Sequence, residues 1–449
     1  REAVRIYRRD RGNHASPNAA QTEAVCAGAL GVRLGGDAGY FGKTVKKPYI
    51  GGEMRRAARE DIRLANRLMY GAAWLGEILC LLLLCLMIFA LSAERNHERT
   101  IGNMIVHGGD IYRNHVEIDF SVNTNPLGTP QAVKAAMRRA IEQCGRYPDM
   151  EAEALKSAVS GMIGVPGEYL VFGNGASELF MAIVHGIRPK KTVIPVPSFY
   201  GYEYAAGTAE SEILYYELKP ENNFQVTEDF YSVLTEDTDL VFLANPNNPT
   251  GSLMEREMLM DLLRHCKRAG IYVVLDECFI EFCAGGCSVI SELEKFDHCI
   301  LVRAFTKIFS IPGVRLGYLI CKNKPLLAKI AAQLPEWNLS CFAQEAGCAC
   351  AGEGAFVAET QRYVSRERAF LEERLRRAGF WVYPGAANFI LIHREEREAE
   401  RGLYERLLEK GILIRNCENF RGLGRGYYRV AVKCREENLR LLRALEECC

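Results

Sequence analysis

The sequence lacks any excess of charge of one sign, because 56 lysines and arginines balance 56 aspartates and glutamates. Proteins that bind nucleic acid usually carry a basic face that neutralises phosphates, so this balance argues against a nucleic-acid partner. The sequence also lacks the short cysteine framework of a secreted module, since its 17 cysteines are scattered along 449 residues. We therefore expect free thiols in a reducing, cytoplasmic compartment. None of these cysteines shows a recognised metal-ligand spacing, and no metal site is expected.

The N-terminal part differs from the remainder in composition. The chain starts without a methionine or a signal peptide, and we expect it to be a piece of a longer protein. Residues 1–70 contain 14 basic and 7 acidic residues, and residues 72–91 then form a long apolar run with one charge, Glu77. About 20 apolar residues suffice to cross a bilayer. The run therefore predicts a membrane span, with a buried core helix or a re-entrant segment as the alternatives.

One lysine, Lys307, is central to the rest of the chain. It follows an apolar strand expected at residues 299–302 and lies among Phe305, Ile308 and Phe309. Apolar surroundings disfavour the ammonium form, so the amine of such a lysine can attack an aldehyde near neutral pH. A lysine after a strand is more often a solvated loop residue, so its interpretation depends on the neighbouring motifs.

Two of these motifs are suited to a flat ligand that carries a phosphate. Residues 173–178, Gly-Asn-Gly-Ala-Ser-Glu, follow a short strand and open a helix. Their glycines and free N–H groups could cradle a phosphate, although a serine-capped helix start looks similar. Residues 197–202 place aromatic rings directly after the strand expected at 192–196. One of these rings could stack on the ligand rather than join the core.

Two polar residues at strand ends complete the pattern. Asn248 lies in Asn-Asn-Pro-Thr-Gly, residues 247–251, and Asp276 follows the strand expected at 271–275. A buried carboxylate is costly unless it is paired with a cation, and a protonated pyridine nitrogen would be such a cation. Asn248 could donate a hydrogen bond to a phenolic oxygen on the same ring.

The order of these motifs resembles that of the fold-type I pyridoxal-phosphate enzymes of the histidinol-phosphate aminotransferase group. The motifs are residues 247–251, 276–277 and 306–307, followed by Arg315. The resemblance runs from residue 106 to the C-terminus. It implies an α/β fold with a large domain, 106–340, around a mostly parallel sheet of seven strands, and a smaller α/β domain, 341–449. It also implies pyridoxal 5′-phosphate as cofactor and a homodimer with shared active sites. Transferred by position, the cofactor residues are Lys307 for the Schiff base; Gly175, Ala176, Ser177, Thr306 and Arg315 for the phosphate; Tyr202 for ring stacking; Asn248 and Asp276 for the ring oxygen and nitrogen; and Tyr147 for the neighbouring subunit's phosphate.

Within this group the sequence is most similar to the L-threonine-phosphate decarboxylases. The resemblance rests on three features: His107-Gly108-Gly109, Asn125-Pro126-Leu127-Gly128, and a Phe at position 279, where the aminotransferases usually carry Tyr. They imply decarboxylation of L-threonine O-3-phosphate to (R)-1-aminopropan-2-yl phosphate. Ala304 and Cys278 depart from the family pattern. The substrate residues implied are His107, Asn125 and Arg421 for the phosphate and Arg429 for the carboxylate.

Residues 1–91 carry a second resemblance, to the C-terminal part of adenosylcobinamide-phosphate synthase, an integral membrane enzyme of cobalamin assembly. Arg8–Asn18 and the glycine-rich stretch up to Pro48 are the matching positions. Only a tail of that family is present, so we expect it to act as an anchor, joined to the catalytic part by a linker at 92–105. The product of the decarboxylase is the substrate of that synthase, and this relation favours decarboxylation as the function of the C-terminal part.

Three functions are therefore considered: the decarboxylase, a histidinol-phosphate-type aminotransferase, and a non-catalytic, membrane-anchored partner of cobalamin enzymes. We expect the catalytic domain to be cytoplasmic and tethered to the cytoplasmic membrane. Five arginines between residues 55 and 67 precede the apolar run and two follow it, which would place the N-terminal side in the cytoplasm. That orientation conflicts with a cytoplasmic catalytic domain, and the sequence leaves the conflict open.

Overall fold

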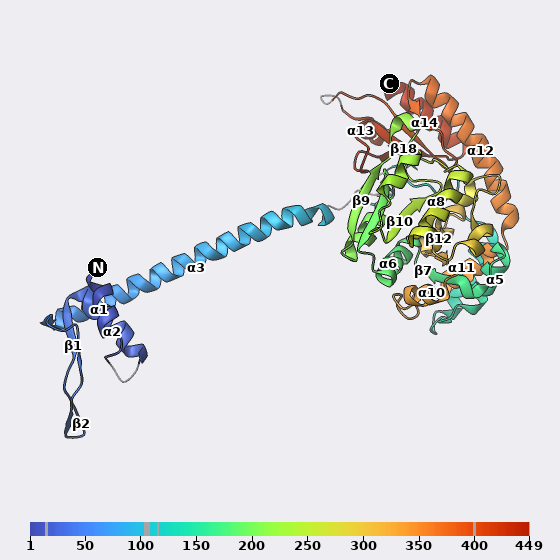
Figure 1. The fold of residues 1–449 in the computed structure, drawn as a ribbon. Coiled ribbons are helices and arrows are strands. Elements are labelled where there is room, and N and C mark those ends of the chain that lie inside the picture. The colour runs from blue at the N-terminus through green and yellow to red at the C-terminus, as the bar shows by residue number, and fades with distance from the viewer. Residues whose placement is uncertain (14–16, 103–107, 115, 398–400, 449) are drawn as a thin grey trace. The chain divides into compact units, whose positions relative to one another are not determined.

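The computed structural model describes residues 1–13, 17–102, 108–114, 116–397 and 401–448; side chains are not described at 17–19, 40 and 82–102 (Figure 1). The chain divides into two compact units, 1–104 and 105–449. His107, a predicted substrate residue, lies outside the described residues.

The N-terminal unit is small and has a correspondingly small core. Helices α1 (Glu2–Asp10) and α2 (Pro17–Leu30) precede a three-stranded sheet, β4 (Tyr49–Ile50), β1 (Val32–Gly35) and β5 (Arg55–Arg56), and a hairpin of β2 (Ala38–Tyr40) and β3 (Lys43–Val45). Its buried apolar cluster consists of Ile6, Ala24, Ala27 and Ile50. A Cβ at Gly28 would lie 2.6 Å from the Cα of Ala3, so a glycine is required where the two helices meet.

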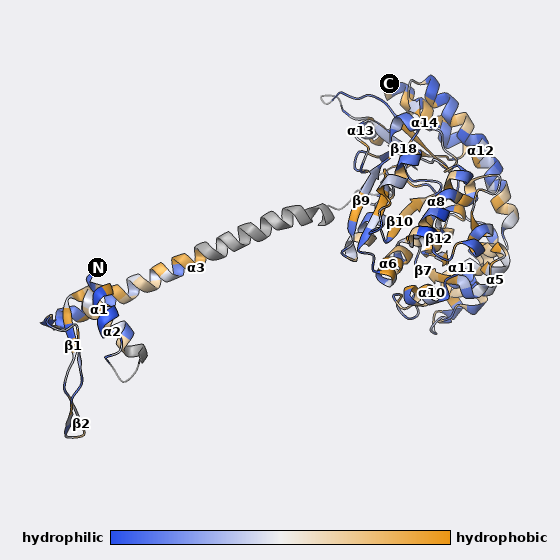
Figure 2. Cartoon of the chain, in the orientation of Figure 1, coloured by the Kyte–Doolittle hydropathy of each residue, from blue (hydrophilic) through white to orange (hydrophobic). Residues whose placement is uncertain are grey.

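Helix α3 (Arg59–Gly102) contains the predicted membrane span. Apolar side chains on its described part are exposed, including Trp74, Leu75 and Leu79. Figure 2 shows hydrophobic and hydrophilic residues alternating along the described part of the helix ribbon. Among the residues that the structure describes, no helix has both the length and the apolar composition needed to cross a membrane. The second half of the predicted span, residues 82–91, lies outside the described side chains.

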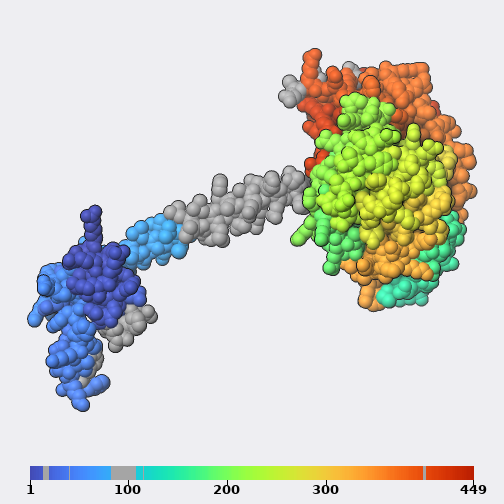
Figure 3. All heavy atoms as spheres, in the orientation of Figure 1, coloured from blue at the N-terminus to red at the C-terminus, as the bar shows by residue number. Residues whose placement is uncertain are grey.

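The catalytic unit, residues 105–449, is built on a seven-stranded sheet, and Figure 3 shows its atoms coloured from teal to red. Strand β13 alone runs antiparallel to its two neighbours. The central strands are buried along nearly their whole length, because helices cover the sheet and leave no face for water. The mostly parallel, seven-stranded sheet implied by the sequence is confirmed. Its strands, in spatial order, are β7 (Leu170–Gly173), β13 (Gly317–Ile320), β12 (Cys299–Ala304), β11 (Tyr272–Asp276), β10 (Leu240–Ala244), β8 (Lys191–Val196) and β9 (Glu212–Glu217).

Helices precede, connect and follow the strands of this sheet in the chain. They are α4 (Gln131–Ala140), α5 (Glu153–Ile163), α6 (Ala176–Ile187), α7 (Gly201–Thr208), α8 (Arg256–Ala269), α9 (Phe305–Ile308), α10 (Lys324–Ala331) and α11 (Cys341–Ala351).

The C-terminal part carries a second, antiparallel sheet. Its strands are β14 (Trp381–Val382), β15 (Phe389–His393), β18 (Tyr427–Ala431) and β17 (Arg415–Asn416), with helices α12 (Gly354–Arg377), α13 (Leu403–Glu409) and α14 (Arg435–Cys448). A short parallel pair joins β16 (Ile412–Leu413) to β6 (Ile118–Asp119). The first strand of the catalytic unit is thus held beside its C-terminal part, and both contribute to the site described next.

Candidate active site

The predicted site residues gather where several strands of the large sheet end. Ala244, Asp276 and Val302 lie opposite one another on three parallel strands. Ala304 lies opposite Gly317, which in turn lies opposite Gly173. Since parallel strands end at a common edge, the loops after them meet there, and ligands of such sheets bind at this edge.

Lys307 lies in the short helix α9, directly after β12. Its backbone carbonyl accepts a hydrogen bond from the backbone N–H of Asn125 at 3.0 Å. Burial, followed by the positive charges of Arg429 and Arg315, lowers the pKa of the Lys307 amine to about 8. A substantial neutral fraction near physiological pH suits this amine for attack on an aldehyde.

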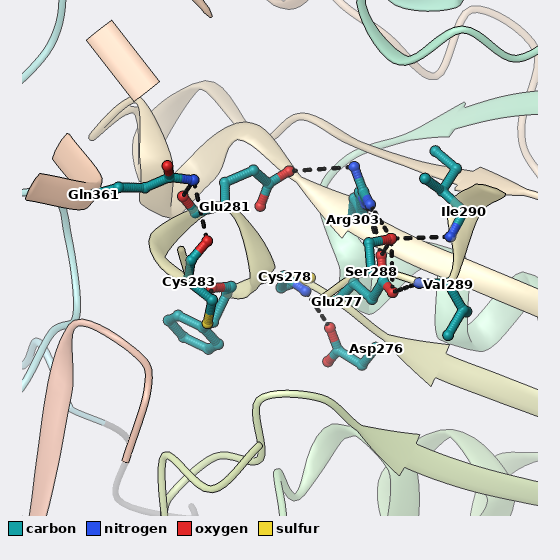
Figure 4. A network of polar contacts seen from close by, with 11 residues as sticks. Asp276, Glu277, Cys278, Glu281, Cys283, Ser288, Val289, Ile290, Arg303 and Gln361 are labelled. Carbon is teal, nitrogen blue, oxygen red and sulfur yellow. Dashed lines mark hydrogen bonds and ion pairs between the residues drawn. The ribbon is translucent and has the colours of Figure 1, made fainter. Parts of the chain in front are cut away.

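Asp276 is buried at the end of β11 and both its oxygens are held. Its Oδ1 accepts the backbone N–H of Cys278 at 2.8 Å, shown in Figure 4, and its Oδ2 accepts the hydroxyl of Tyr202 at 2.5 Å. Burial raises the pKa of Asp276, while these donors oppose that rise. The carboxylate therefore has a fixed orientation, and a cationic ring nitrogen would offset the cost of its burial.

Tyr202 is buried within the hydrophobic core. It is 1% exposed, and its ring stacks on Phe242 with centroids 5.1 Å apart and contacts Phe180 edge-on. The structure thus uses this ring for packing and its hydroxyl for Asp276. Phe199 is half-buried and contacts the Tyr202 ring edge-on, at 5.7 Å between centroids.

The predicted phosphate cradle lies between the start of α6 and Arg315. Gly175 has φ +81°, and a Cβ there would lie 2.6 Å from Nη2 of Arg315. That nitrogen donates to the carbonyl of Asn174 at 3.1 Å. Ala176 and Ser177 form the first turn of α6, whose N–H groups have no helical partner. With Thr306 one residue before Lys307, this donor set fits the phosphate of pyridoxal 5′-phosphate.

A buried ionic network holds the loop that follows β11. Glu277 is fully buried, and its Oε2 accepts Nη2 of Arg303 at 2.7 Å and the hydroxyl of Ser288 at 2.7 Å (Figure 4). Glu277 follows β11 and Arg303 belongs to β12. The pair therefore joins the strand that ends in Asp276 to the strand that precedes Lys307. Glu281 lies nearby, and burial raises its pKa to about 7.

Two arginines face each other on the second sheet. Arg429 of β18 lies opposite Arg415 of β17, and residues opposite each other in an antiparallel pair share one face. Both are buried, and neither forms an ion pair with a carboxylate among the residues that the structure describes. Burial lowers the pKa of Arg429 to about 10. Arg415 donates to the carbonyl of Asn416 at 2.6 Å and to Oδ1 of Asn419 at 2.7 Å, but both acceptors are neutral. Buried charges without an opposite charge are costly, so this pair is suited to anionic groups of a ligand.

The contacts of Arg429 connect this pair to the predicted residues. Its Nη1 donates to Oδ1 of Asn248, and its Nη2 donates to the backbone carbonyl of Ser121 at 2.9 Å. Its Nε is buried without a partner in the structure. The guanidinium therefore lies beside Asn248 and near Lys307, where the sequence places the substrate carboxylate.

Two other predicted substrate residues have different partners in the structure. Arg421 pairs with Glu203 at 3.1 Å and lies over the Tyr215 ring at 4.0 Å, so its charge is already compensated. The side chain of Asn125 donates to the Ile308 carbonyl at 2.7 Å and to Thr360, and accepts from the N–H of Leu127. Asn125 therefore holds the backbone around Lys307 rather than a ligand.

Sequence reasoning missed Arg415 as a candidate. Its pairing with Arg429 depends on the register of β17 with β18, which the sequence does not show. Tyr147, the residue predicted to reach a second subunit, is 77% exposed and lies against Trp337 with ring centroids 4.8 Å apart.

Comparisons with known proteins agree with this geometry. Residues 116–445 match the family model "Aminotransferase class I and II", and residues 1–69 match "CobD/Cbib protein". The chain is 36% identical to the threonine-phosphate decarboxylase of Salmonella typhimurium, over 73% of this chain and 90% of that one. Among solved structures, the histidinol-phosphate aminotransferase from Clostridium acetobutylicum superposes with a TM-score of 0.70 at 33% identity, covering 74% of this chain and 98% of that one. The L-threonine-O-3-phosphate decarboxylase from Porphyromonas gingivalis gives 0.67 at 25% identity, covering 74% and 99%.

Proposed function

The chain belongs to the aminotransferase class I and II family, and we propose that it decarboxylates L-threonine O-3-phosphate, with pyridoxal 5′-phosphate as its cofactor. The products are (R)-1-aminopropan-2-yl phosphate and carbon dioxide. The similarity to threonine-phosphate decarboxylases over nine-tenths of their length supports this choice of reaction.

The structural observation that carries the substrate class is the pair of buried arginines. Arg415 and Arg429 bring two positive charges to one face of a sheet, beside Asn248. A substrate with a carboxylate and a phosphate supplies two anionic groups in one small molecule, which would compensate both charges. We assign Arg429 to the carboxylate and Arg415, in place of Arg421, to the phosphate.

The residues around Lys307 would hold the cofactor. Ala176, Ser177, Thr306 and Arg315 would bind its phosphate, Asp276 its ring nitrogen and the amide nitrogen of Asn248 its ring oxygen. When bound, pyridoxal phosphate accepts the electron pair released when a bond to the substrate Cα breaks. Asp276, anchored by Tyr202 and Cys278, keeps the ring nitrogen protonated so that this pair can be accepted.

Lys307 has two tasks in this proposal. Its neutral amine would hold the cofactor through the aldehyde, and when the substrate occupies the site the Lys307 amine could deliver a proton to the substrate Cα. A pKa of about 8 allows the same nitrogen to carry and to release a proton near neutral pH. Arg429 would fix the direction of the substrate carboxylate at this site.

A product assay tests the reaction directly. The full chain is loaded with pyridoxal phosphate and given L-threonine O-3-phosphate without any keto acid. We expect many turnovers that release carbon dioxide and aminopropanol phosphate in equal amounts. A histidinol-phosphate aminotransferase is the second candidate, because a solved structure of that name is 33% identical to the chain. Amino transfer from histidinol phosphate to 2-oxoglutarate, with no carbon dioxide, would decide for it.

We further propose that the enzyme is a homodimer in which Tyr147 reaches the cofactor phosphate of the other subunit. Its ring is 77% exposed in the single subunit, so it is accessible to a second subunit. Inactive Lys307→Ala and Tyr147→Ala chains, mixed and reassembled, should regain about a quarter of the parent activity, since half of the dimers would have one intact site. Activity no greater than the sum of the separate variants would exclude a shared site.

Finally, we propose that helix α3 tethers a cytoplasmic catalytic unit to the cytoplasmic membrane. Exposed apolar residues on its described part, Trp74, Leu75, Ile78, Leu79 and Leu81, support contact with lipid or with a membrane protein. The full chain should stay with the membrane fraction after an alkaline carbonate wash. Complete release by that wash would exclude an integral anchor.

A further inference from the structure

Two thiols of the catalytic unit lie side by side, far from Lys307 in the chain. Cys144 follows the short 3-10 helix η1 (Ile141–Gln143), and Cys341 is the first residue of α11. Their sulfur atoms are 4.0 Å apart, although 197 residues separate them. Both thiols lie 3.7 Å from the same acceptor, the carbonyl oxygen of Ala140. Both sulfurs therefore point into one small space between α4 and α11.

Other contacts hold the two segments in this arrangement. On one side of the thiols, Nε2 of Gln143 donates to Oε1 of Glu345 at 3.0 Å. On the other, Nε2 of Gln344 donates to the carbonyl of Asp149 at 2.7 Å. The segment on either side of Cys144 is thus fixed to α11, and the sulfurs stay opposite each other. A disulfide needs them about 2 Å closer, a distance that side-chain rotation can provide.

The two thiols also differ in access. Cys144 is exposed, whereas Cys341 is half-buried. A small reagent can therefore reach Cys144 first and leave Cys341 in position to react with the product. This order of attack and resolution is what thiol–disulfide exchange requires.

We propose that Cys144 and Cys341 form a second reactive site, a dithiol that small-molecule disulfides convert reversibly into an intramolecular disulfide. The Cys144 thiolate attacks one sulfur of the reagent, which forms a mixed disulfide and releases one thiolate. The Cys341 thiolate then attacks the Cys144 sulfur and releases the second. The protein loses two protons and two electrons, and the reagent is reduced to two thiols. None of the residues assigned to the cofactor takes part, so the proposal does not depend on the decarboxylase assignment.

The position of this bond gives it a consequence for the fold. The disulfide would form at Cys144, three residues before Tyr147, whose ring contacts the ring of Trp337. In the oxidised protein the segment that carries Tyr147 is covalently attached to α11, while in the reduced protein only hydrogen bonds and the ring contact hold it. Oxidation should therefore slow local opening of residues 144–149.

Peptide mapping of the full chain loaded with pyridoxal phosphate tests the proposal. The protein is treated with oxidised glutathione, its remaining thiols are alkylated in denaturant, and its peptides are analysed by mass spectrometry. We expect a linked pair of peptides that contain Cys144 and Cys341, lighter by two hydrogen atoms than the reduced peptides together, and lost on treatment with dithiothreitol. Two separate glutathione adducts, or two unmodified thiols, would overturn it.

Single variants make the test specific. Cys144→Ser and Cys341→Ser should each abolish the linked peptide. Cys348→Ser is the matched control, because Cys348 is a half-buried thiol two turns further along α11, and it should leave the link unchanged. Hydrogen exchange on the oxidised parent should show slower exchange at residues 144–149 than on the reduced parent, a difference absent from Cys341→Ser. Equal exchange in both states, or a link that forms equally in denaturant, would show that the folded arrangement does not direct the reaction.

Discussion

Lys307 lies where burial and two guanidinium charges, those of Arg429 and Arg315, act on one amine. Each of these influences disfavours the ammonium form, so they add, and the pKa falls to about 8. Below that pH the amine is mostly protonated and cannot attack an aldehyde; above it the neutral form prevails. The reactivity of this residue is therefore set by its neighbours.

The first prediction concerns the pH dependence of cofactor capture. The rate at which the apoprotein binds pyridoxal phosphate should rise with pH, with a midpoint near 8, and then level off, measured by the absorbance of the Schiff base. Arg429→Gln removes a positive neighbour and should move this midpoint to higher pH. Arg421→Gln is the control, since Arg421 is paired with Glu203, and it should leave the midpoint in place. A parent midpoint near 10 would contradict the burial argument.

The second prediction concerns Tyr202. Tyr202→Phe keeps the ring between Phe180 and Phe242 but removes the donor to Asp276. A lost hydrogen bond to a buried charged group costs about 1.5–3 kcal/mol, so pyridoxal phosphate should bind roughly 10- to 100-fold more weakly, measured by equilibrium titration. Tyr204→Phe, on the same helix but half exposed, should bind the cofactor as the parent does. Unchanged affinity in Tyr202→Phe would show that Asp276 does not depend on this hydroxyl.

At the scale of elements, the phosphate cradle depends on one backbone conformation. Gly175 has φ +81°, which L side chains rarely adopt, and it leaves space that Arg315 fills. The third prediction is that Gly175→Ala displaces Arg315 and weakens cofactor binding by about 10-fold or more. The strain alone contributes about 1–3 kcal/mol, because φ +81° with ψ 174° lies in a region that essentially only glycine adopts. Gly313→Ala, at a position with open space on the approach to Arg315, should retain parent affinity. Equal losses in both variants would argue against a cradle at Gly175.

The elements themselves were largely predictable from the sequence. Strands β8, β11 and β12 are buried apolar runs bounded by turn residues, and their expected positions were correct within about two residues. Glycine and asparagine turns after these strands located the cofactor motifs. Predictability was high here because each of these features depends on residues close together in the chain.

Side-chain partners were harder to predict. The family resemblance points to Arg421 for the substrate phosphate, whereas only the register of β17 with β18 shows that Arg415 faces Arg429. The buried position of Tyr202 depends on Phe242 and Phe180, which come from other elements. These are long-range contacts, and local sequence carries little information about them.

At the scale of the whole molecule, the chain joins two units with different relatives. Residues 1–69 match a cobalamin-assembly family model, while the catalytic unit belongs to the aminotransferase class I and II family. Such a fusion would place the supplier of an aminopropanol phosphate in the same chain as residues that match the enzyme family that uses it. This arrangement favours the decarboxylase over the aminotransferase for a reason independent of the site.

The measurement that tests the central claim most directly is the partition between the two reactions on one substrate. The full chain with bound pyridoxal phosphate is given L-threonine O-3-phosphate alone, and carbon dioxide and the pyridoxamine form of the cofactor are followed together. We predict that carbon dioxide accumulates over many turnovers while the cofactor stays in its aldehyde form. Lys307→Ala should abolish the release of carbon dioxide. Conversion of the cofactor to its amine form in a single turnover, with no carbon dioxide, would contradict the account.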